Sequence, residues 1–348
     1  MQRRENTVEW FDQYVYFLAK ALTVLVVVAL ILAMIAAGKA RSKRTEGTLS
    51  VTRLNDRLQR MHEQLGLMVL SKGACKARQK QLKQEAKARD KDAAQDERGR
   101  VYVLNFHGDI KASALENLRH EVTAVLELAR PQDEVVVRLE SGGGMVHAYG
   151  LASSQLVRVR EAGIPLTISV DKVAASGGYM MACIADRILA APFAMLGSIG
   201  VVAQLPNFNR LLKKHDIDFE MLTAGEYKRT LTVFGENSDK AREKFQDDLE
   251  NIHRLFKQFV ARYRPSLDIE TVATGEVWFG SEALLRGLAD EIKTSDQYLC
   301  ERVRQADVFE VQFEQRKRLQ DRLSGGLAQA ADRLLLTWVS RFNNQRFW

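Results

Sequence analysis

The chain has 348 residues, of which 46% are hydrophobic and 27% are charged, and its formal net charge is +7. This composition excludes a disordered chain and is sufficient for one large or two modest domains. Much of the basic excess lies between Lys39 and Arg100, outside the expected core, so we predict no nucleic-acid partner. Cys75, Cys183 and Cys300 are too few and too far apart for a disulfide framework or a metal site.

An uncharged apolar run at residues 21–38 predicts a membrane-spanning helix. With residues 14–19 before it, the run reaches the roughly 20 residues that span a bilayer. The alternative is a cleaved signal peptide, but the run is longer than the roughly 7–15 residue core of such a signal. We therefore predict a retained single-pass anchor in residues 1–40.

The basic residues around this run bear on its orientation. Arg3 and Arg4 precede it, whereas a larger set follows it, namely Lys39, Arg41, Lys43, Arg44, Arg53, Arg57 and Arg60. The positive-inside rule then places the residues after the helix in the cytoplasm.

Residues 41–100 form a predicted basic linker, helical or disordered. Apolar residues with a 3-4-3-4-3 spacing occupy its first part, namely Val51, Leu54, Leu58, Met61, Leu65 and Met68. This spacing fits either a short coiled coil or an ordinary amphipathic juxtamembrane helix. Residues 72–100 are rich in charged residues, glutamine and alanine, and we expect them to be solvated and close to lipid headgroups.

From residue 101 onward, apolar strand-like runs alternate with helical runs. Strands are expected at 101–106, 134–139, 165–170, 186–190 and 219–223, and helices at 115–129, 146–162 and 179–185. This alternation predicts an α/β domain over residues 101–300 with mostly parallel strands. Such sheets carry their functional sites beyond the carboxyl ends of the strands.

A glycine loop, ESGGGM at residues 140–145, follows the second of these strands. It can expose backbone N–H groups as an oxyanion hole or a phosphate cradle would, or it can be a plain flexible turn. A dinucleotide-binding fingerprint is excluded because His147 stands where it needs a glycine.

Ser176 lies in the turn VAASGGY at residues 173–179, between an apolar strand and a helical run. A strand that leads into serine, glycine and a helix presents the hydroxyl group and leaves N–H groups facing any negative charge that develops. The alternative is a tight strand-to-helix turn that simply requires small residues.

A nucleophilic serine needs a base. Of the six histidines, none lies in a recognisable triad pattern, and His147 is a weak candidate because it opens a helix. Lys228, in TAGEYKRT at residues 223–230, is the other candidate, since a buried neutral lysine can act as a general base.

Taken together, these motifs resemble the signal peptide peptidase A family of serine–lysine proteases. The resemblance rests on the glycine loop, the ASGGY turn, LGSIGV at 196–201, GEYK at 225–228 and GEVWFG at 275–280, in this order. It covers about residues 101–292. Gly142 is a departure, because the family usually has proline there, and this loosens the loop.

The resemblance implies a ClpP/crotonase-like spiral of strand–helix units and hydrolysis of peptide bonds without metal or cofactor. By position, Ser176 is then the nucleophile, Lys228 the general base and Ser198 the residue that orients the lysine. The N–H groups of Gly143 and Gly177 form the oxyanion hole. Members with one catalytic half per chain assemble into oligomers and can take serine and lysine from neighbouring protomers, so we predict a homo-oligomer.

Two other classes of function stay open: a crotonase-type acyl-CoA enzyme and a catalytically silent membrane scaffold. For the protease, the expected substrates are remnant signal peptides or other membrane-associated or misfolded polypeptides, and the expected location is the bacterial inner membrane. The family's catalytic domain generally lies outside the cytoplasm, whereas the charge distribution of this chain favours the inside.

The C-terminal extension, residues 301–348, contains a predicted amphipathic helix at 327–348 with apolar residues at helical spacing and three arginines. Such a helix can lie on an anionic membrane surface or pack against a neighbouring protomer.

Overall fold

The computed structural model describes residues 47–71, 73–78, 80–82, 84 and 98–315, together with residues 20, 22, 23 and 25. The chain divides into two compact units, residues 1–48 with 315–348 and residues 49–314. The second unit contains most of the described residues. Most of the predicted anchor and all of the predicted C-terminal helix lie outside the described residues. Within the described part of the chain, no helix is long and apolar enough to cross a membrane.

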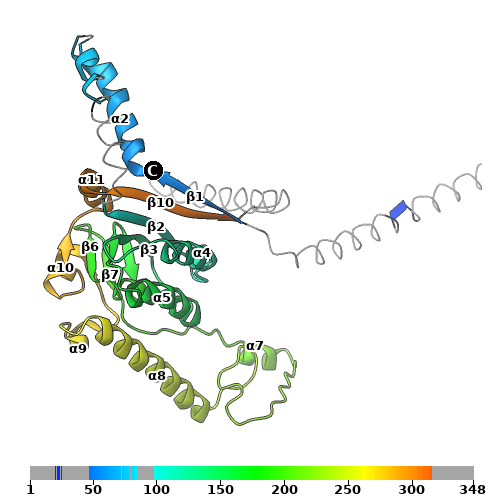
Figure 1. Cartoon of the computed structure of the whole chain (residues 1–348). Helices are drawn as coiled ribbons and strands as arrows, with labels where there is room; N and C mark the ends of the chain where they lie inside the picture. The colour runs from blue at the N-terminus through cyan, green and yellow to red at the C-terminus, as the bar shows by residue number, and fades with distance from the viewer. Residues whose placement is uncertain are drawn as a thin grey trace, which may run out of the picture. The chain divides into compact units, whose positions relative to one another are not determined.

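A mostly parallel sheet forms the centre of the unit (Figure 1). Its strands lie in the order β1-β10-β2-β3-β4-β6-β9. Their bounds are β1 Gly47–Arg53, β2 Arg100–Gly108, β3 Glu134–Ser141, β4 Leu166–Val170, β6 Arg187–Ala190, β9 Glu291–Ile292 and β10 Asp307–Gln315. A branch of three short strands leaves the sheet at β3, made of β5 Val173–Ala175, β7 Met195–Gly197 and β8 Val277–Phe279. The predicted α/β class with mostly parallel strands is confirmed.

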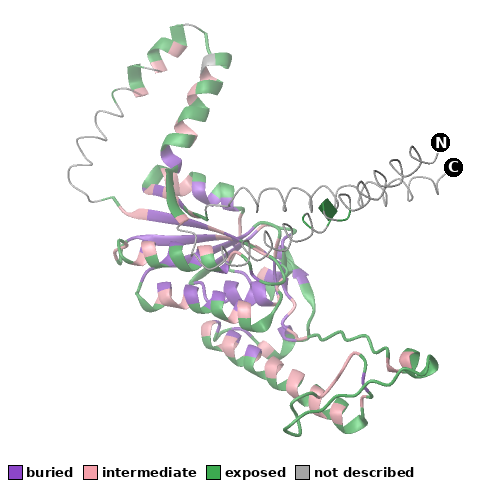
Figure 2. Ribbon diagram, turned by 90° about the vertical axis from the view of Figure 1, so that its right-hand side faces the viewer, coloured by how far each residue is buried: buried purple, intermediate pink, exposed green. Residues whose placement is uncertain are grey.

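Helices connect the strands, as expected for parallel neighbours. They are α2 Leu54–Val69, α4 Leu115–Leu126, α5 Val146–Glu161, α6 Gly177–Ala182, α7 Asn209–Lys214, α8 Asp239–Tyr263, α9 Ile269–Val272, α10 Gly280–Leu285 and α11 Ser295–Gln305. The core strands read as nearly continuous apolar runs because side chains on both of their faces are buried (Figure 2).

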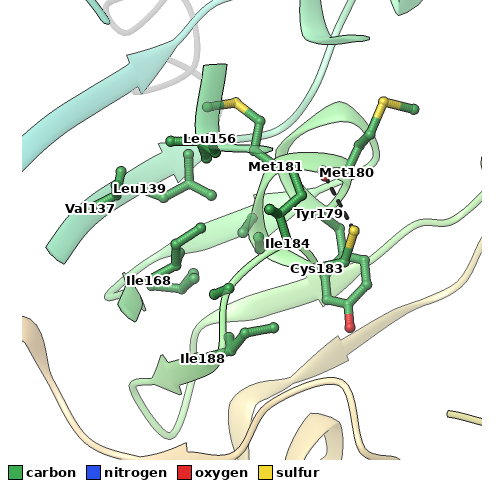
Figure 3. Packing of buried hydrophobic residues seen from close by; sticks show 14 of the residues in the cluster. Val137, Leu139, Leu156, Ile168, Tyr179, Met180, Met181, Cys183, Ile184 and Ile188 are labelled. Atoms are coloured by element: carbon green, nitrogen blue, oxygen red, sulfur yellow. Dashed lines mark hydrogen bonds between the residues drawn. The ribbon is translucent and has the colours of Figure 1, made fainter. Parts of the chain in front are cut away.

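Two buried clusters fill the two faces of the sheet. The larger one contains alternate residues of β2, such as Leu104 and Phe106, and side chains of α4, α5 and α6. Figure 3 shows Met181 and Ile184 of this cluster near residues of the sheet. The smaller one contains the other residues of β2, Val101 and Val103, with side chains of α11 and β10. The segment around Ser176 is therefore built into the main core.

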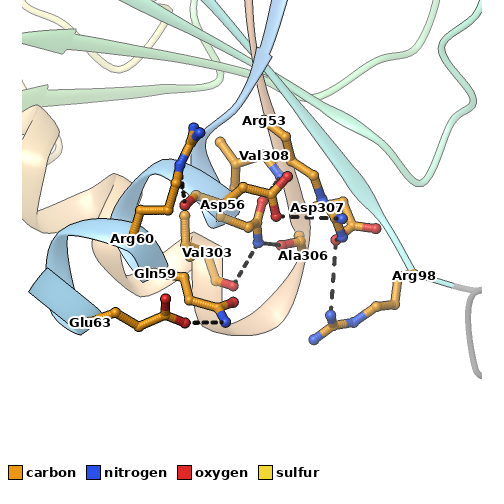
Figure 4. A network of polar contacts seen from close by, with 11 residues as sticks. Arg53, Asp56, Gln59, Arg60, Glu63, Arg98, Val303, Ala306, Asp307 and Val308 are labelled. Atoms are coloured by element: carbon orange, nitrogen blue, oxygen red, sulfur yellow. Dashed lines mark hydrogen bonds and ion pairs between the residues drawn. The ribbon is translucent and has the colours of Figure 1, made fainter. Parts of the chain in front are cut away.

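The start of α2 is hydrogen-bonded to the turn between α11 and β10 (Figure 4). The buried Asn55 amide donates to the carbonyl oxygens of Val303 and Ala306, both at 3.0 Å, and its Oδ1 accepts from the Val308 N–H at 2.8 Å. Arg53 pairs with Asp307 at 2.7 Å. These contacts hold the first residues of α2 against the edge of the sheet. The apolar spacing of the linker does not predict this attachment.

Several expected boundaries differ from the observed ones. Residues 219–223 form no strand. Their side chains are exposed and do not pack against the core. Val51 belongs to β1, so the helical apolar stripe begins only at Leu54. Strand β10 pairs in parallel with β2, and the sheet thus extends beyond the predicted domain end at residue 300.

The carboxyl group of Glu121 in α4 gives a testable pH dependence of stability. Its Oε1 accepts from the Phe313 N–H of β10 at 2.8 Å, whereas the buried Oε2 has no hydrogen-bond partner among the described residues. Burial raises the pKa of Glu121 from 4.5 to about 7. Between these values the folded state holds a proton that the unfolded state has lost, so stability falls as the pH rises through this window.

We therefore expect Glu121→Gln to remove this pH dependence and to be more stable than the wild type at pH 8 by about 2 kcal/mol. Urea unfolding at about pH 5 and 8 measures it. Glu116→Gln, an exposed glutamate on the same helix, is the matched control. Equal changes in unfolding free energy for wild type and Glu121→Gln between the two pH values would contradict the prediction.

Candidate active site

Three loops meet because three strand ends lie side by side. Ser141, the last residue of β3, pairs with Ala174 of β5, and Ala175 pairs with Gly197, the last residue of β7, all in parallel. The residues that follow these strands therefore gather at one edge. They are the glycine loop after β3, Ser176 after β5 and Ser198 after β7.

Ser176 occupies the sharp turn between β5 and α6. Its backbone has φ 52° and ψ −119°, a conformation that L-residues rarely adopt and that costs about 1–3 kcal/mol. The Ser176 N–H donates to the Gly197 carbonyl at 2.8 Å, and the Ser176 carbonyl accepts from the Met180 N–H at 2.9 Å. The turn is thus held on both sides, with the side chain half-buried at the edge of a cavity.

Gly143 and Gly177 lie against each other beside Ser176. A Cβ atom on Gly143, which has φ 87°, would stand 2.6 Å from the Gly177 nitrogen and 2.8 Å from the Ser176 Cβ. A Cβ atom on Gly177 would stand 2.4 Å from Cγ of the buried Tyr149 ring. Both positions therefore require glycine, and the structure brings both predicted oxyanion residues to the serine.

The Gly143 N–H has an internal partner in this structure. It donates to the Ser141 Oγ at 3.0 Å. The Ser141 hydroxyl lies 2.5 Å from the Tyr149 hydroxyl, which in turn donates to the Asp109 carbonyl at 2.8 Å. A role for Gly143 in an oxyanion hole would require its N–H to be shared with, or released from, Ser141.

A cavity of about 640 Å³ opens at Ser176. The glycine loop, Ser198 and the start of α6 contribute to its wall. Apolar side chains form much of the rest, namely Val146, Met180, Val201, Val202, Ile252 and Phe256. A cavity of this size and lining suits an apolar side chain of an extended polypeptide.

Ser198 also lines this cavity and has an unusual backbone, with φ 51°. Its N–H donates to the Glu276 carbonyl at 2.6 Å. Ser176 and Ser198 are therefore both held by backbone contacts at the mouth of one cavity.

Lys228 does not line the cavity of its own chain. It is exposed, in the segment that joins β7 to α8 and that is exposed along most of its length (Figure 2). In Figure 1 the part of this segment around α7 extends beyond the end of α8, away from the sheet. Its apolar residues are largely uncovered, Leu222 being 94% and Val202 81% exposed. The predicted serine and lysine are thus not brought together within one chain.

The two histidines His147 and His253 differ in their position relative to the cavity. His147 is exposed and does not line the cavity, whereas His253 of α8 does, and its Nε2 lies 3.1 Å from the Ile199 carbonyl oxygen. The sequence assigned His253 no role, since it lies in no recognisable triad pattern. In the described part of the chain, no group of three or more His, Cys, Asp or Glu side chains is arranged to hold a metal ion.

Comparison with known proteins places these features in a family. The model of the peptidase family S49 N-terminal region matches residues 9–156, and the model of peptidase family S49 matches residues 158–308. A protein named "Probable protease SohB" from Haemophilus influenzae is 48% identical over 316 residues, which cover 88% of this chain and 90% of that protein.

The chain belongs to peptidase family S49. It is thereby a member of a family of proteases, as the motifs predicted. A further relative, "Serine protease SPPA, chloroplastic" from Arabidopsis thaliana, is 31% identical over 51% of this chain and 26% of its own length. Among solved structures, the 1510-N membrane-bound stomatin-specific protease with a substrate peptide has a TM-score of 0.40 and 15% identity, and the match covers 67% of this chain and 99% of that chain.

Because Gly177 is tightly packed, we predict that adding a single methyl group at this position lowers the activity. Gly177→Ala places a Cβ atom 2.4 Å from Tyr149, so the turn must move. We expect peptide hydrolysis to fall about 100-fold, because a displacement of about 1 Å at a reacting group has this effect, and stability to fall by about 1–3 kcal/mol.

Gly150→Ala is the matched control, since a Cβ atom on this α5 glycine meets nothing within 4 Å. Its activity should equal that of the wild type, with stability unchanged or higher by up to about 1 kcal/mol. Wild-type turnover in Gly177→Ala would show that the turn tolerates the displacement.

Proposed function

We propose that the protein is a membrane-anchored serine endopeptidase that hydrolyses peptide bonds through a Ser176–Lys228 dyad. The observation that carries this proposal is the presentation of Ser176. Its side chain stands at a rare backbone turn, beside two glycines that admit no side chain, in a cavity that is partly lined by apolar side chains. Membership of peptidase family S49 supports the same reaction.

In the proposed reaction, the neutral amine of Lys228 removes the proton of the Ser176 hydroxyl as its Oγ attacks the peptide carbonyl. The oxyanion accepts from the Gly177 N–H and from the Gly143 N–H once the latter turns from Ser141. The lysine returns the proton to the leaving amine, and water then hydrolyses the acyl-enzyme. Ser198 accepts a hydrogen bond from the lysine and orients it.

We propose that the base comes from a neighbouring protomer, because Lys228 is exposed and does not line the cavity of its own chain. Docking the segment that carries it onto a second copy would cover its exposed apolar side chains and bring the amine to Ser176. Removal from water favours the neutral form of a lysine, as a base requires. The protomer fold that we propose for this assembly is a ClpP/crotonase-like spiral, in keeping with the strand branch beside Ser176.

For substrates we propose apolar segments of membrane-associated polypeptides, such as remnant signal peptides, or misfolded proteins, since apolar side chains such as Val146, Met180 and Phe256 contribute to the cavity wall. We further propose that residues 21–38 anchor the enzyme in the bacterial inner membrane. A reporter fused to the C-terminus assigns the side of the membrane on which the catalytic domain lies.

A fluorophosphonate probe tests the proposed function. It should label the assembled full-length protein in detergent at Ser176, located by peptide mapping, and should not label Ser176→Ala. Ser281→Ala, which removes an exposed serine elsewhere, should label like the wild type. An acyl-CoA enzyme or a silent scaffold would give no labelling at Ser176, and this result would refute the proposal.

A further inference from the structure

The turn that carries Ser198 is bound directly to the nucleophile. Its first residue, Gly197, accepts from the Ser176 N–H at 2.8 Å, and the Ser198 N–H donates to the Glu276 carbonyl at 2.6 Å. Gly197 has φ 101° and Ser198 has φ 51°. Because a non-glycine residue keeps such a conformation only where its surroundings impose it, the turn depends on the contacts that hold it.

One of these contacts comes from a side chain. The Nε2 atom of His253 lies 3.1 Å from the carbonyl oxygen of Ile199, the residue after Ser198. The Ile199 side chain is fully buried, which leaves its peptide group little freedom. The histidine ring itself faces the cavity that contains Ser176.

Helix α8 holds the ring in place. Phe256, one turn after His253, and Val260 are 4% and 0% exposed and belong to the main core. The helix is therefore anchored by the next two turns, and the ring of His253 is presented to the Ile199 carbonyl from a rigid element.

We propose that His253 is a positioning residue, which fixes the Ser198 turn by donating its Nε2–H to the Ile199 carbonyl and so sets where the Ser198 hydroxyl meets the lysine. This inference rests on the proposed dyad. The donation needs no change of protonation state, because both the cation and one neutral tautomer carry a proton on Nε2. The role is thus distinct from that of a general base.

Kinetics of purified full-length variants test the proposal. His253→Ala should lower kcat for peptide hydrolysis about tenfold and leave KM within about twofold, since the loss concerns an arrangement used in the reaction. His253→Gln places an amide N–H donor near the position of Nε2 and should restore most of the rate. Gln246→Ala, an exposed residue of the same helix, is the control.

A double-mutant cycle identifies the route by which His253 acts. If it acts through Ser198, then adding His253→Ala to Ser198→Ala should cause no further loss of kcat. The proposal would be overturned if the double variant lost kcat by the product of the two single losses. A wild-type kcat in His253→Ala, or a failure of His253→Gln to restore kcat, would overturn it as well.

Amide hydrogen exchange gives a readout that does not depend on activity. In His253→Ala the amides of Ser198 and Gly200 should exchange at least about tenfold faster, while those of β3 keep their rates. Unchanged exchange in the turn would overturn the proposal even if the wild type showed no peptidase activity. Failure of the proposed function is seen separately, as a wild-type protein that neither cleaves peptides nor labels at Ser176.

Discussion

Replacing Ser176 by alanine should abolish peptide hydrolysis, with a fall in kcat of at least about 10⁴-fold. In the proposed mechanism the hydroxyl forms the covalent bond to the substrate, and no other serine stands at the turn between β5 and α6. The fold should be retained, because the side chain is only half-buried and the contacts that hold the turn come from its backbone. Peptide cleavage by purified variants of matched oligomeric state measures the effect.

Ser281→Ala serves as the control and should cleave at the wild-type rate, because Ser281 lies in α10 and is exposed. Substantial turnover in Ser176→Ala would exclude Ser176 as the nucleophile. Circular dichroism checks that Ser176→Ala keeps the fold of the wild type, so that a loss of activity can be assigned to the missing hydroxyl.

Replacing Lys228 should have an effect of similar size, and arginine should not rescue it. An arginine keeps its proton in proteins, so Lys228→Arg carries a fixed positive charge and cannot accept the proton of the serine. We expect both Lys228→Ala and Lys228→Arg to lose at least about 10³-fold in kcat. The measurement is again peptide cleavage, with assembly checked by gel filtration.

Lys214→Ala is the matched control for this change, since it removes an exposed lysine from α7 in the same segment. If Lys228→Arg kept substantial turnover, the lysine would not be the base. His253 would then be the next residue to examine as the base, because it lines the cavity and His147 does not.

The main sheet could be predicted because its strands are short apolar runs, and the segments between them have apolar residues at helical spacing. Residues 134–139 and 165–170 were predicted as strands, and β3 and β4 occupy these positions. Strand β5 was not predicted, since its three residues carry no periodicity and are defined by their partners in β3 and β7. Residues 219–223 have the composition of a strand but pair with no strand in the described part of the chain.

The end of the domain was harder to predict. From Phe309 onward, strand β10 alternates apolar with charged or polar residues, as in Phe309, Glu310, Val311 and Gln312. This pattern fits a strand near the border of a sheet, but a pairing with β2, some 200 residues earlier in the chain, is not visible in local periodicity. Long-range pairing of this kind depends on the packing of the whole core.

The candidate site shows the same limit. Ser176, Ser198, Gly143 and Gly177 were predicted from motifs, and they meet because each follows the end of a neighbouring strand. The placement of Lys228 outside the cavity could not be derived from its motif. A motif gives order along the chain, whereas a contact between chains depends on surfaces that only the folded protomer presents.

The central claim is that one protomer supplies the serine and its neighbour the lysine, and mixing two inactive variants tests it most directly. Ser176→Ala and Lys228→Ala, tagged differently, are unfolded, mixed in equal amounts and reassembled, and mixed oligomers are isolated through both tags. With random assembly, about a quarter of the sites receive both an intact serine and an intact lysine, so about a quarter of the wild-type activity should return. Mixed oligomers that stay inactive, while wild-type protein treated in the same way regains its activity, would contradict the account.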